Sequence, residues 1–146
     1  MLFLKKPDDF DPIFEAAGCF CDFQGKFILL HRQDHLDVEP NKWGLPSGKI
    51  DYEYVELPRE GMQREIKEET GLIIPVKRLY LVSITYVRFP DFDFTYYIFR
   101  TRLLKEPKVR LNPKEHKDWQ IVSPGETKKF DLFMDLEPCI KLCYGF

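Results

Sequence analysis

The chain has 146 residues, a formal net charge of −2 at pH 7 and an apolar content of 44%. This length is typical of one domain, and the apolar content excludes a disordered chain because it suffices to form a core. The net charge argues against broad nucleic-acid binding through a basic surface, whereas a nucleotide needs only a few local cations. We therefore expect a single domain over residues 1–146.

The predicted elements begin with two strands, 14–23 and 26–33, which are apolar runs joined by a hairpin around Gln24-Gly25. The apolar residues 1–4 that precede them are followed at once by Lys5 and Lys6, too early for a signal-peptide core. No apolar run approaches the length of a membrane span. We therefore expect a cytoplasmic protein without membrane contact, whose four cysteines are reduced thiols.

A helix is predicted after the polar loop 34–42. It begins near Pro58, which suits the first turn, and ends before Gly71. Met62, Ile66 and Thr70 form its apolar stripe, which predicts packing against a sheet. Further strands are expected at 73–89, 92–104 and 118–122, and a closing amphipathic helix at 131–144. Strands interspersed with helices predict an α/β or α+β sandwich.

The predicted helix carries three carboxylates on one side. Glu65, Glu68 and Glu69 share an arc of about 100° on a helical projection. Like charges at this spacing repel, so a folded protein can keep them together by placing a cation over them. Oxygen ligands favour a hard ion, Mg²⁺ or Mn²⁺. A merely solvated helix face is an equally good interpretation of the helix by itself.

The stretch from Gly48 to Leu72 resembles the Nudix box, G-x5-E-x7-R-E-U-x-E-E-x-G-U, where U is aliphatic. The matching residues are Glu56, Arg64, Glu65, Ile66, Glu68, Glu69, Gly71 and Leu72. Seven residues, rather than five, separate Gly48 from Glu56, which we interpret as a two-residue insertion within the loop segment IDYEYV. The resemblance implies a Nudix-like α/β/α sandwich with a mixed sheet, and it continues more weakly over most of residues 14–122.

The resemblance also implies roles for individual residues. The metal ligands would be Glu65, Glu68, Glu69 and the carbonyl of Gly48, with Mg²⁺ or Mn²⁺ as the cofactor. Either Glu65 or Glu115 would be the general base that activates water. Arg64, counted with the catalytic group, would orient Glu65 or pair with Glu56 rather than touch the substrate.

The sequence gives a less specific signal for the residues that contact the substrate than for those that bind the metal. Arg32 and Lys49 are candidates to bind phosphate, although each has the alternative of an ordinary surface cation. An aromatic wall for a nucleobase is one interpretation of Phe92, Phe94, Tyr96, Phe130 and Phe133, and core packing is the other. His116, beside a charged loop, is expected to be solvated or structural.

The sequence is compatible with three functions. The leading hypothesis is a metal-dependent pyrophosphohydrolase that cleaves a diphosphate linkage in a nucleoside diphosphate derivative, such as a nucleoside triphosphate, a dinucleoside polyphosphate or a nucleotide sugar. The alternatives are a non-catalytic nucleotide-sensing module of the same fold and an enzyme similar to isopentenyl diphosphate isomerase. The isomerase would need a suitably placed cysteine. The expected partner is a small nucleotide, and the sequence leaves the oligomeric state open.

Overall fold

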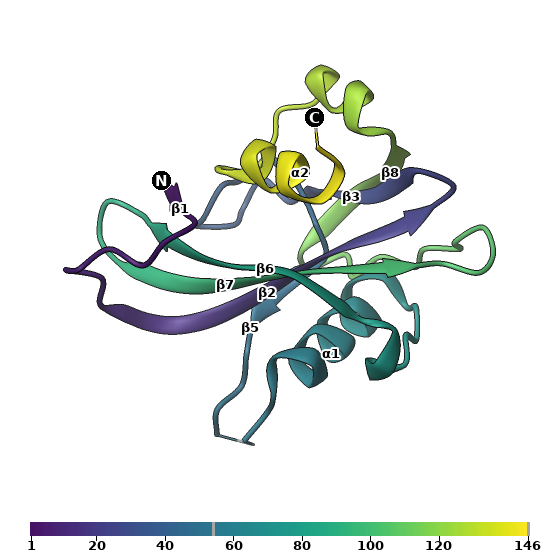
Figure 1. The fold of residues 1–146 in the computed structure, drawn as a ribbon. Helices are drawn as coiled ribbons and strands as arrows, with labels where there is room; N and C mark the ends of the chain where they lie inside the picture. The colour runs from purple at the N-terminus through teal and green to yellow at the C-terminus, as the bar shows by residue number, and fades with distance from the viewer. Residues whose placement is uncertain (54, 146) are drawn as a thin grey trace.

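The computed structural model describes residues 1–53 and 55–145, and in this part of the chain a sheet separates two helices (Figure 1). Helix α1 (Pro58–Thr70) covers one face of the sheet, and α2 (Leu136–Tyr144) covers the other. The strands are β1 (Leu2–Phe3), β2 (Pro12–Phe23), β3 (Lys26–Arg32), β4 (Trp43–Gly44), β5 (Ser47–Lys49), β6 (Tyr80–Arg88), β7 (Asp93–Arg102) and β8 (His116–Val122). Two short 3₁₀ helices, η1 (Val76–Arg78) and η2 (Pro124–Lys129), complete the elements.

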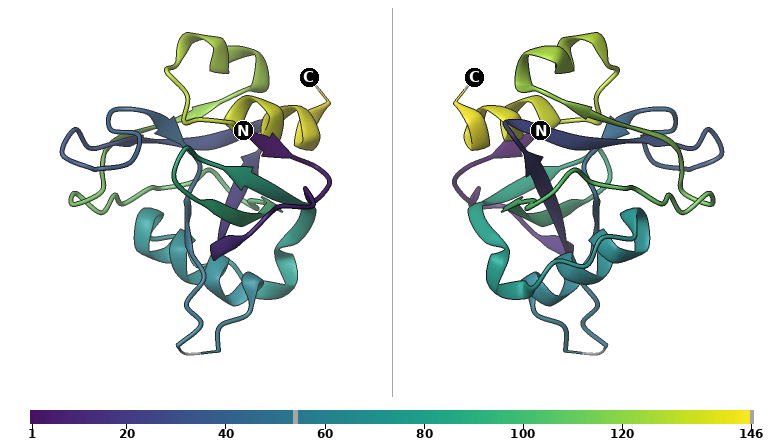
Figure 2. Two further views of the ribbon diagram at one scale, coloured as in Figure 1. Left: turned by 90° about the vertical axis from the view of Figure 1, so that its left-hand side faces the viewer. Right: turned by 90° about the vertical axis from the view of Figure 1, so that its right-hand side faces the viewer.

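The strand order is β1-β6-β7-β2-β3-β4, with β5 beside β2 and β8 beside β3. Strands β2 and β7 run parallel along nearly their whole length, and the other pairs are antiparallel. The predicted α/β/α sandwich with a mixed sheet is therefore confirmed. Figure 2 shows from both sides that the sheet lies between the two helices.

Side chains alternate across the sheet and form a core layer on each face. On β3, Ile28 and Leu30 join the layer under α1, and Phe27 and Leu29 join the layer under α2. This alternation follows from the two-residue period of a strand and explains why β3 is apolar at every position from 27 to 30. Ile66 of α1 is fully buried in the first layer.

Helix α1 has the ends that its sequence predicts. Pro58 occupies its first turn, and Gly71 closes it in the left-handed conformation with φ of 78°, where glycine has no steric cost. The predicted apolar stripe of Met62, Ile66 and Thr70 is fully buried. The helix therefore lies on the sheet in one rotational setting, and that setting determines where its carboxylates point.

The segment after α1 departs from the strand expected over 73–89. Strand β6 begins only at Tyr80, and residues 76–78 form the 3₁₀ helix η1. Pro75 causes this difference, since its fixed φ initiates the turn and its carbonyl accepts a hydrogen bond from the amide of Arg78 at 2.9 Å.

The closing helix is also shorter than the range 131–144 predicted from its periodicity. The carbonyl of Asp131 accepts from the amide of Trp43, and the amide of Phe133 donates to the carbonyl of Trp43, each at 2.8 Å. These bonds tie residues 131–133 to β4, and Asp135 then takes a left-handed φ of 65°, which is incompatible with a continuing helix. Helix α2 therefore starts at Leu136.

All four cysteines are free thiols, and Cys19, Cys21 and Cys139 are buried. Neither α-helix in the described part of the chain is both long and apolar enough to cross a bilayer.

The core position of Ile66 predicts a large effect of truncation. We expect Ile66→Ala to lower the free energy of unfolding by about 2–5 kcal/mol, because it leaves a cavity between α1 and the sheet. Ile73 is 72% exposed, so Ile73→Ala is the matched control and should stay within about 0.5 kcal/mol of the parent. Urea unfolding of the three proteins measures both values, and equal losses in the two variants would contradict this packing.

Candidate functional site

Arg64 connects the loop before α1 to the carboxylates on the helix. Its Nε and Nη2 donate to the two carboxylate oxygens of Glu56 at 2.7 and 2.9 Å, and Nη2 also donates to the carbonyl of Lys49 at 3.0 Å. Its Nη1 donates to Glu65 at 2.8 Å and to Glu68 at 3.2 Å. Bonding to Glu56 is the main reason that the pKa of Arg64 lies above its ordinary value. One guanidinium thus holds three carboxylates in place.

The loop that contains the two-residue insertion is closed at its base. The amide of Asp51 donates to a carboxylate oxygen of Glu56 at 2.8 Å, and the amide of Glu56 donates to the carbonyl of Asp51 at 3.1 Å. The segment 50–55, within which the insertion is predicted, includes Tyr54, which lies outside the described residues. Because the loop closes at Asp51 and Glu56, Glu56 remains in register with Arg64.

Glu65 lies against Gly48 at the edge of β5. A Cβ atom at Gly48 would stand 2.1 Å from the carboxyl carbon of Glu65, so only glycine allows this approach. The Glu65 side chain is 13% exposed, and burial raises its pKa to about 7, with a further contribution from Glu68. The bond from Arg64 opposes that shift. Glu65 can therefore exchange a proton near neutral pH.

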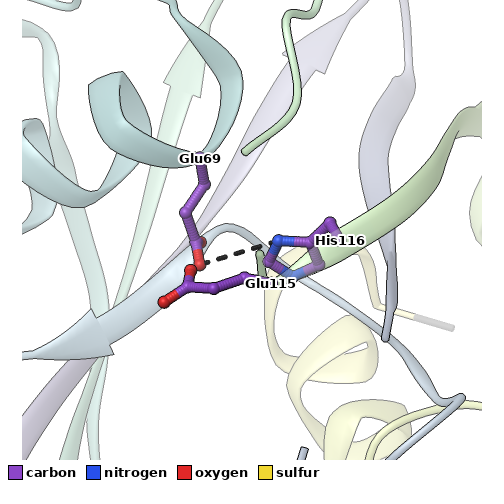
Figure 3. Close-up of side chains that lie close together, drawn as sticks. All are labelled: Glu69, Glu115 and His116. Carbon is purple, nitrogen blue, oxygen red and sulfur yellow. Dashed lines mark ion pairs between the residues drawn. The ribbon is translucent and has the colours of Figure 1, made fainter. Parts of the chain in front are cut away.

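Glu69 is buried on the same side of α1, one turn further along. Its Oε1 accepts a hydrogen bond from the amide of Ser47 at 2.8 Å, and its Oε2 lies 3.9 Å from Nδ1 of His116. Burial, followed by the neighbouring carboxyl of Glu115, raises its pKa well above the ordinary value. Figure 3 shows three side chains converging: Glu69 from α1, His116 from the start of β8, and Glu115 from the end of the loop that precedes β8. Their donor atoms lie within 4.8 Å of one another.

Of the two roles expected for His116, solvated or structural, the structure contradicts the solvated one. Strand β8 begins at His116 itself, two residues before the predicted start, and the ring is only 3% exposed. Its Nδ1 is buried and finds no hydrogen-bond partner in the part of the chain that the structure describes. Burial lowers the pKa of His116 to about 4, so the imidazole is neutral at neutral pH.

These residues fit a divalent cation by their chemistry. Glu65, Glu69 and Glu115 are close enough that each of the first two has its pKa raised by the charge of its neighbours. Buried like charges are costly, and a bound cation relieves that cost. Glu68, in contrast, is held by Arg64 with its side chain 52% exposed, outside the group formed by Glu69, Glu115 and His116.

A cavity of about 420 Å³ adjoins the box, and the two predicted phosphate-binding cations, Arg32 and Lys49, line it. The guanidinium of Arg32 donates to the carbonyls of Val38 and Glu39 and lies 5.3 Å from the ring centre of Phe133. Nζ of Lys49 lies 4.4 Å from the ring centre of Phe14. Both cations are thus positioned by aromatic rings at the border between the carboxylates and the cavity.

Aromatic side chains form much of the remaining cavity wall. The predicted members Phe92, Phe94, Tyr96 and Phe133 line it, whereas Phe130 instead packs edge-on against Trp43 at 5.0 Å. The phenylalanines Phe14 and Phe89 also line the cavity and were not predicted. Phe14 stacks on Phe94 at 4.9 Å because β2 and β7 pair in parallel, a contact between segments about 80 residues apart that no local pattern indicates.

A model of the NUDIX domain matches residues 13–143, nearly the whole chain. The chain therefore belongs to the NUDIX domain family. A putative hydrolase, 111R, of Invertebrate iridescent virus 3 is 36% identical over 86 residues, which cover 55% of this chain and 47% of that protein.

Solved structures share the fold at low sequence identity. The MutT protein of Methanosarcina mazei is 22% identical, with a TM-score of 0.76 over 89% of this chain and 91% of its own. The NUDIX domain of Shewanella oneidensis NrtR, solved with ADP ribose, is 16% identical, with a TM-score of 0.77 over 97% and 92%. A Caenorhabditis elegans Ap4A hydrolase is 18% identical, with a TM-score of 0.66 over 92% and 97%.

The forked bonding of Arg64 predicts that lysine cannot replace it. Arg64→Lys keeps the charge but loses the planar set of donors, and we expect the free energy of unfolding to fall by about 1–3 kcal/mol. The exposed Arg102 supplies the control Arg102→Lys, which should leave stability nearly unchanged. Chemical unfolding compares the two variants, and equal stability of Arg64→Lys and the parent would contradict the network.

The raised pKa of Glu65 predicts a pH dependence of the metal-free protein. Glu65 ionises near its ordinary value of 4.5 when unfolded and at about 7 when folded. The folded state therefore binds more protons between these values, and this group lowers stability as the pH rises through that window. Below it, the carboxyl is protonated in both states and the penalty is absent.

Replacing Glu65 by glutamine removes this titration. We expect Glu65→Gln, in chelator, to exceed the parent in stability by about 1–2 kcal/mol above pH 7 and to match it below pH 4.5. Urea unfolding at a series of pH values measures the difference, with the exposed Glu137→Gln as control. A pH-independent difference would contradict the assignment.

Proposed function

We propose that this protein is a metal-dependent pyrophosphohydrolase that cleaves a diphosphate linkage in a nucleoside diphosphate derivative. The substrate classes that we propose are nucleoside triphosphates, dinucleoside polyphosphates and nucleotide sugars, and the ion is Mg²⁺ or Mn²⁺. One observation carries the proposal: the carboxylates of α1 adjoin a cavity whose border holds two cations and whose wall is aromatic. A diphosphate and an attached nucleoside need that combination of anion, cation and stacking contacts.

The box residues would hold the ion. We propose Glu65, Glu68, Glu69 and the carbonyl of Gly48 as its ligands, and a bound divalent ion supplies charge screening and a more acidic water. Ser47 supports this arrangement because its amide fixes one oxygen of Glu69 at 2.8 Å, while the other, Oε2, faces the cluster of Glu115 and His116.

The remaining residues would orient the substrate and move the proton. Arg64 positions Glu65 through the 2.8 Å hydrogen bond and is directed at protein groups rather than at the cavity. Arg32 and Lys49 would bind phosphate oxygens at the cavity border. Glu65 or Glu115 would accept the proton from the attacking water, and the pKa of about 7 supports Glu65, because a base works best near the ambient pH.

The cavity offers little to the isomerase-like alternative. Its lining cysteine, Cys139, donates to the carbonyl of Asp135 at 3.3 Å, and burial raises its pKa to about 12. Such a thiol is a poor nucleophile or acid at neutral pH. The similar structures of the Shewanella oneidensis NrtR domain with ADP ribose and of the Caenorhabditis elegans Ap4A hydrolase support a nucleotide as the ligand of this cavity.

The test is turnover of a panel of nucleotides with and without divalent metal. The panel contains a nucleoside triphosphate, ADP ribose, a dinucleoside tetraphosphate and a nucleotide sugar, and the products are separated by chromatography. We expect metal-dependent release of a nucleoside monophosphate from at least one compound. Glu68→Gln should reduce kcat/KM by about 100-fold or more, because it removes a charged ligand that is exposed enough to be replaced without unfolding the chain.

Glu137→Gln is the matched control, because Glu137 is an exposed glutamate on α2, away from the box. Its kcat/KM should equal that of the parent. Equal turnover by Glu68→Gln and the parent would refute the metal ligands. Tight nucleotide binding without turnover of any compound would refute the enzyme and favour the non-catalytic sensing module.

A further inference from the structure

The buried Nδ1 of His116 has no hydrogen-bond partner among residues 1–53 and 55–145, although it lies among carboxylates. Buried polar atoms are almost always satisfied, so an unpaired ring nitrogen at a functional site calls for a ligand. Oε2 of Glu69 lies 3.9 Å from this nitrogen, too far for a hydrogen bond. The ring also borders the cavity beside the box. A group absent from the protein itself would satisfy this nitrogen.

The distances between the ligand atoms of Glu69, Glu115 and His116 match those between ligands of one metal ion. Ligand atoms that each lie about 2.0–2.2 Å from one ion are separated by at most about 4.4 Å, and the 3.9 Å between His116 and Glu69 is within that limit. The donor atoms of Glu69, Glu115 and His116 all lie within 4.8 Å of one another. Glu115 is exposed, so its side chain can close the small remaining difference by rotation.

The donors also indicate which ion would bind. Oxygen ligands alone suit Mg²⁺, whereas an imidazole nitrogen increases the preference for a first-row transition ion. We propose that Glu69, Glu115 and Nδ1 of His116 form a mixed nitrogen–oxygen site for such an ion, with Mn²⁺ as the probe. The site shares Glu69 and Glu115 with the proposed reaction centre, and in those two residues it rests on the proposed function.

Electron paramagnetic resonance of bound Mn²⁺ tests the nitrogen ligand directly. Pulsed measurements detect hyperfine coupling to a coordinated imidazole nitrogen, and isotopic labelling of histidine alone identifies the residue type. We expect this coupling in the parent protein and its loss in His116→Gln. The dissociation constant for Mn²⁺ should rise by about tenfold or more in that variant, while the constant for Mg²⁺ changes less.

The other two histidines provide the control, since the chain has only three. The double variant His31→Gln/His35→Gln keeps His116 alone and should keep the coupling. This variant and the labelled parent decide the question even if His116→Gln does not fold. Loss of the coupling in the double variant would overturn the assignment to His116.

The remaining outcomes separate this inference from the proposed function. Bound Mn²⁺ without nitrogen coupling in the parent would overturn the His116 site and leave the oxygen ligands of the box in place. Metal-dependent turnover would then still support the proposed hydrolase. Failure of the parent to bind Mn²⁺ would overturn the His116 site, and failure to bind either Mn²⁺ or Mg²⁺ would overturn both.

Discussion

The site depends on the hydrogen bonds of one guanidinium. Glutamates crowded on one face of α1 repel one another, and Arg64 offsets this by bonding to Glu65 and Glu68. The same group holds Glu56 in a two-point contact and also binds the carbonyl of Lys49. The loop, β5 and the helix are therefore fixed relative to one another before any ion binds. Such preorganisation lowers the cost of assembling a metal site.

The cavity depends on pairing between distant segments. The parallel pairing of β2 with β7 places Phe14 against Phe94, and the pairing of β3 with β8 brings His116 to Arg32. Strand β5 adds to β2 and places Gly48 against Glu65. The cavity thus has a charged side at the box and an apolar side at the aromatic rings. That polarity suits a ligand that has a phosphate chain at one end and a flat ring at the other.

Local patterns predicted the helix and its chemistry well, because a helix is formed by neighbours in sequence. The ends at Pro58 and Gly71 and the buried stripe through Ile66 are all in the structure. Errors arose where distant backbone groups intervene, as in residues 131–135, which have helical periodicity but bond to β4. The solvated alternative for His116 was wrong for a similar reason, since its burial comes from α1 and β3 and not from the charged residues beside it in sequence.

By itself, the sequence determined the family and the identity of the carboxylates, because their spacing on one helix depends only on helical geometry and the box motif. Tertiary structure alone decided which of them are buried. Glu69 is enclosed by the packing of Ser47 and His116, while Glu68 on the same helix face stays half exposed. The physical reason is that burial sets both the charge state of a carboxyl side chain and how freely its oxygens can bind an ion. Burial itself is a property of the assembled sheet and helices.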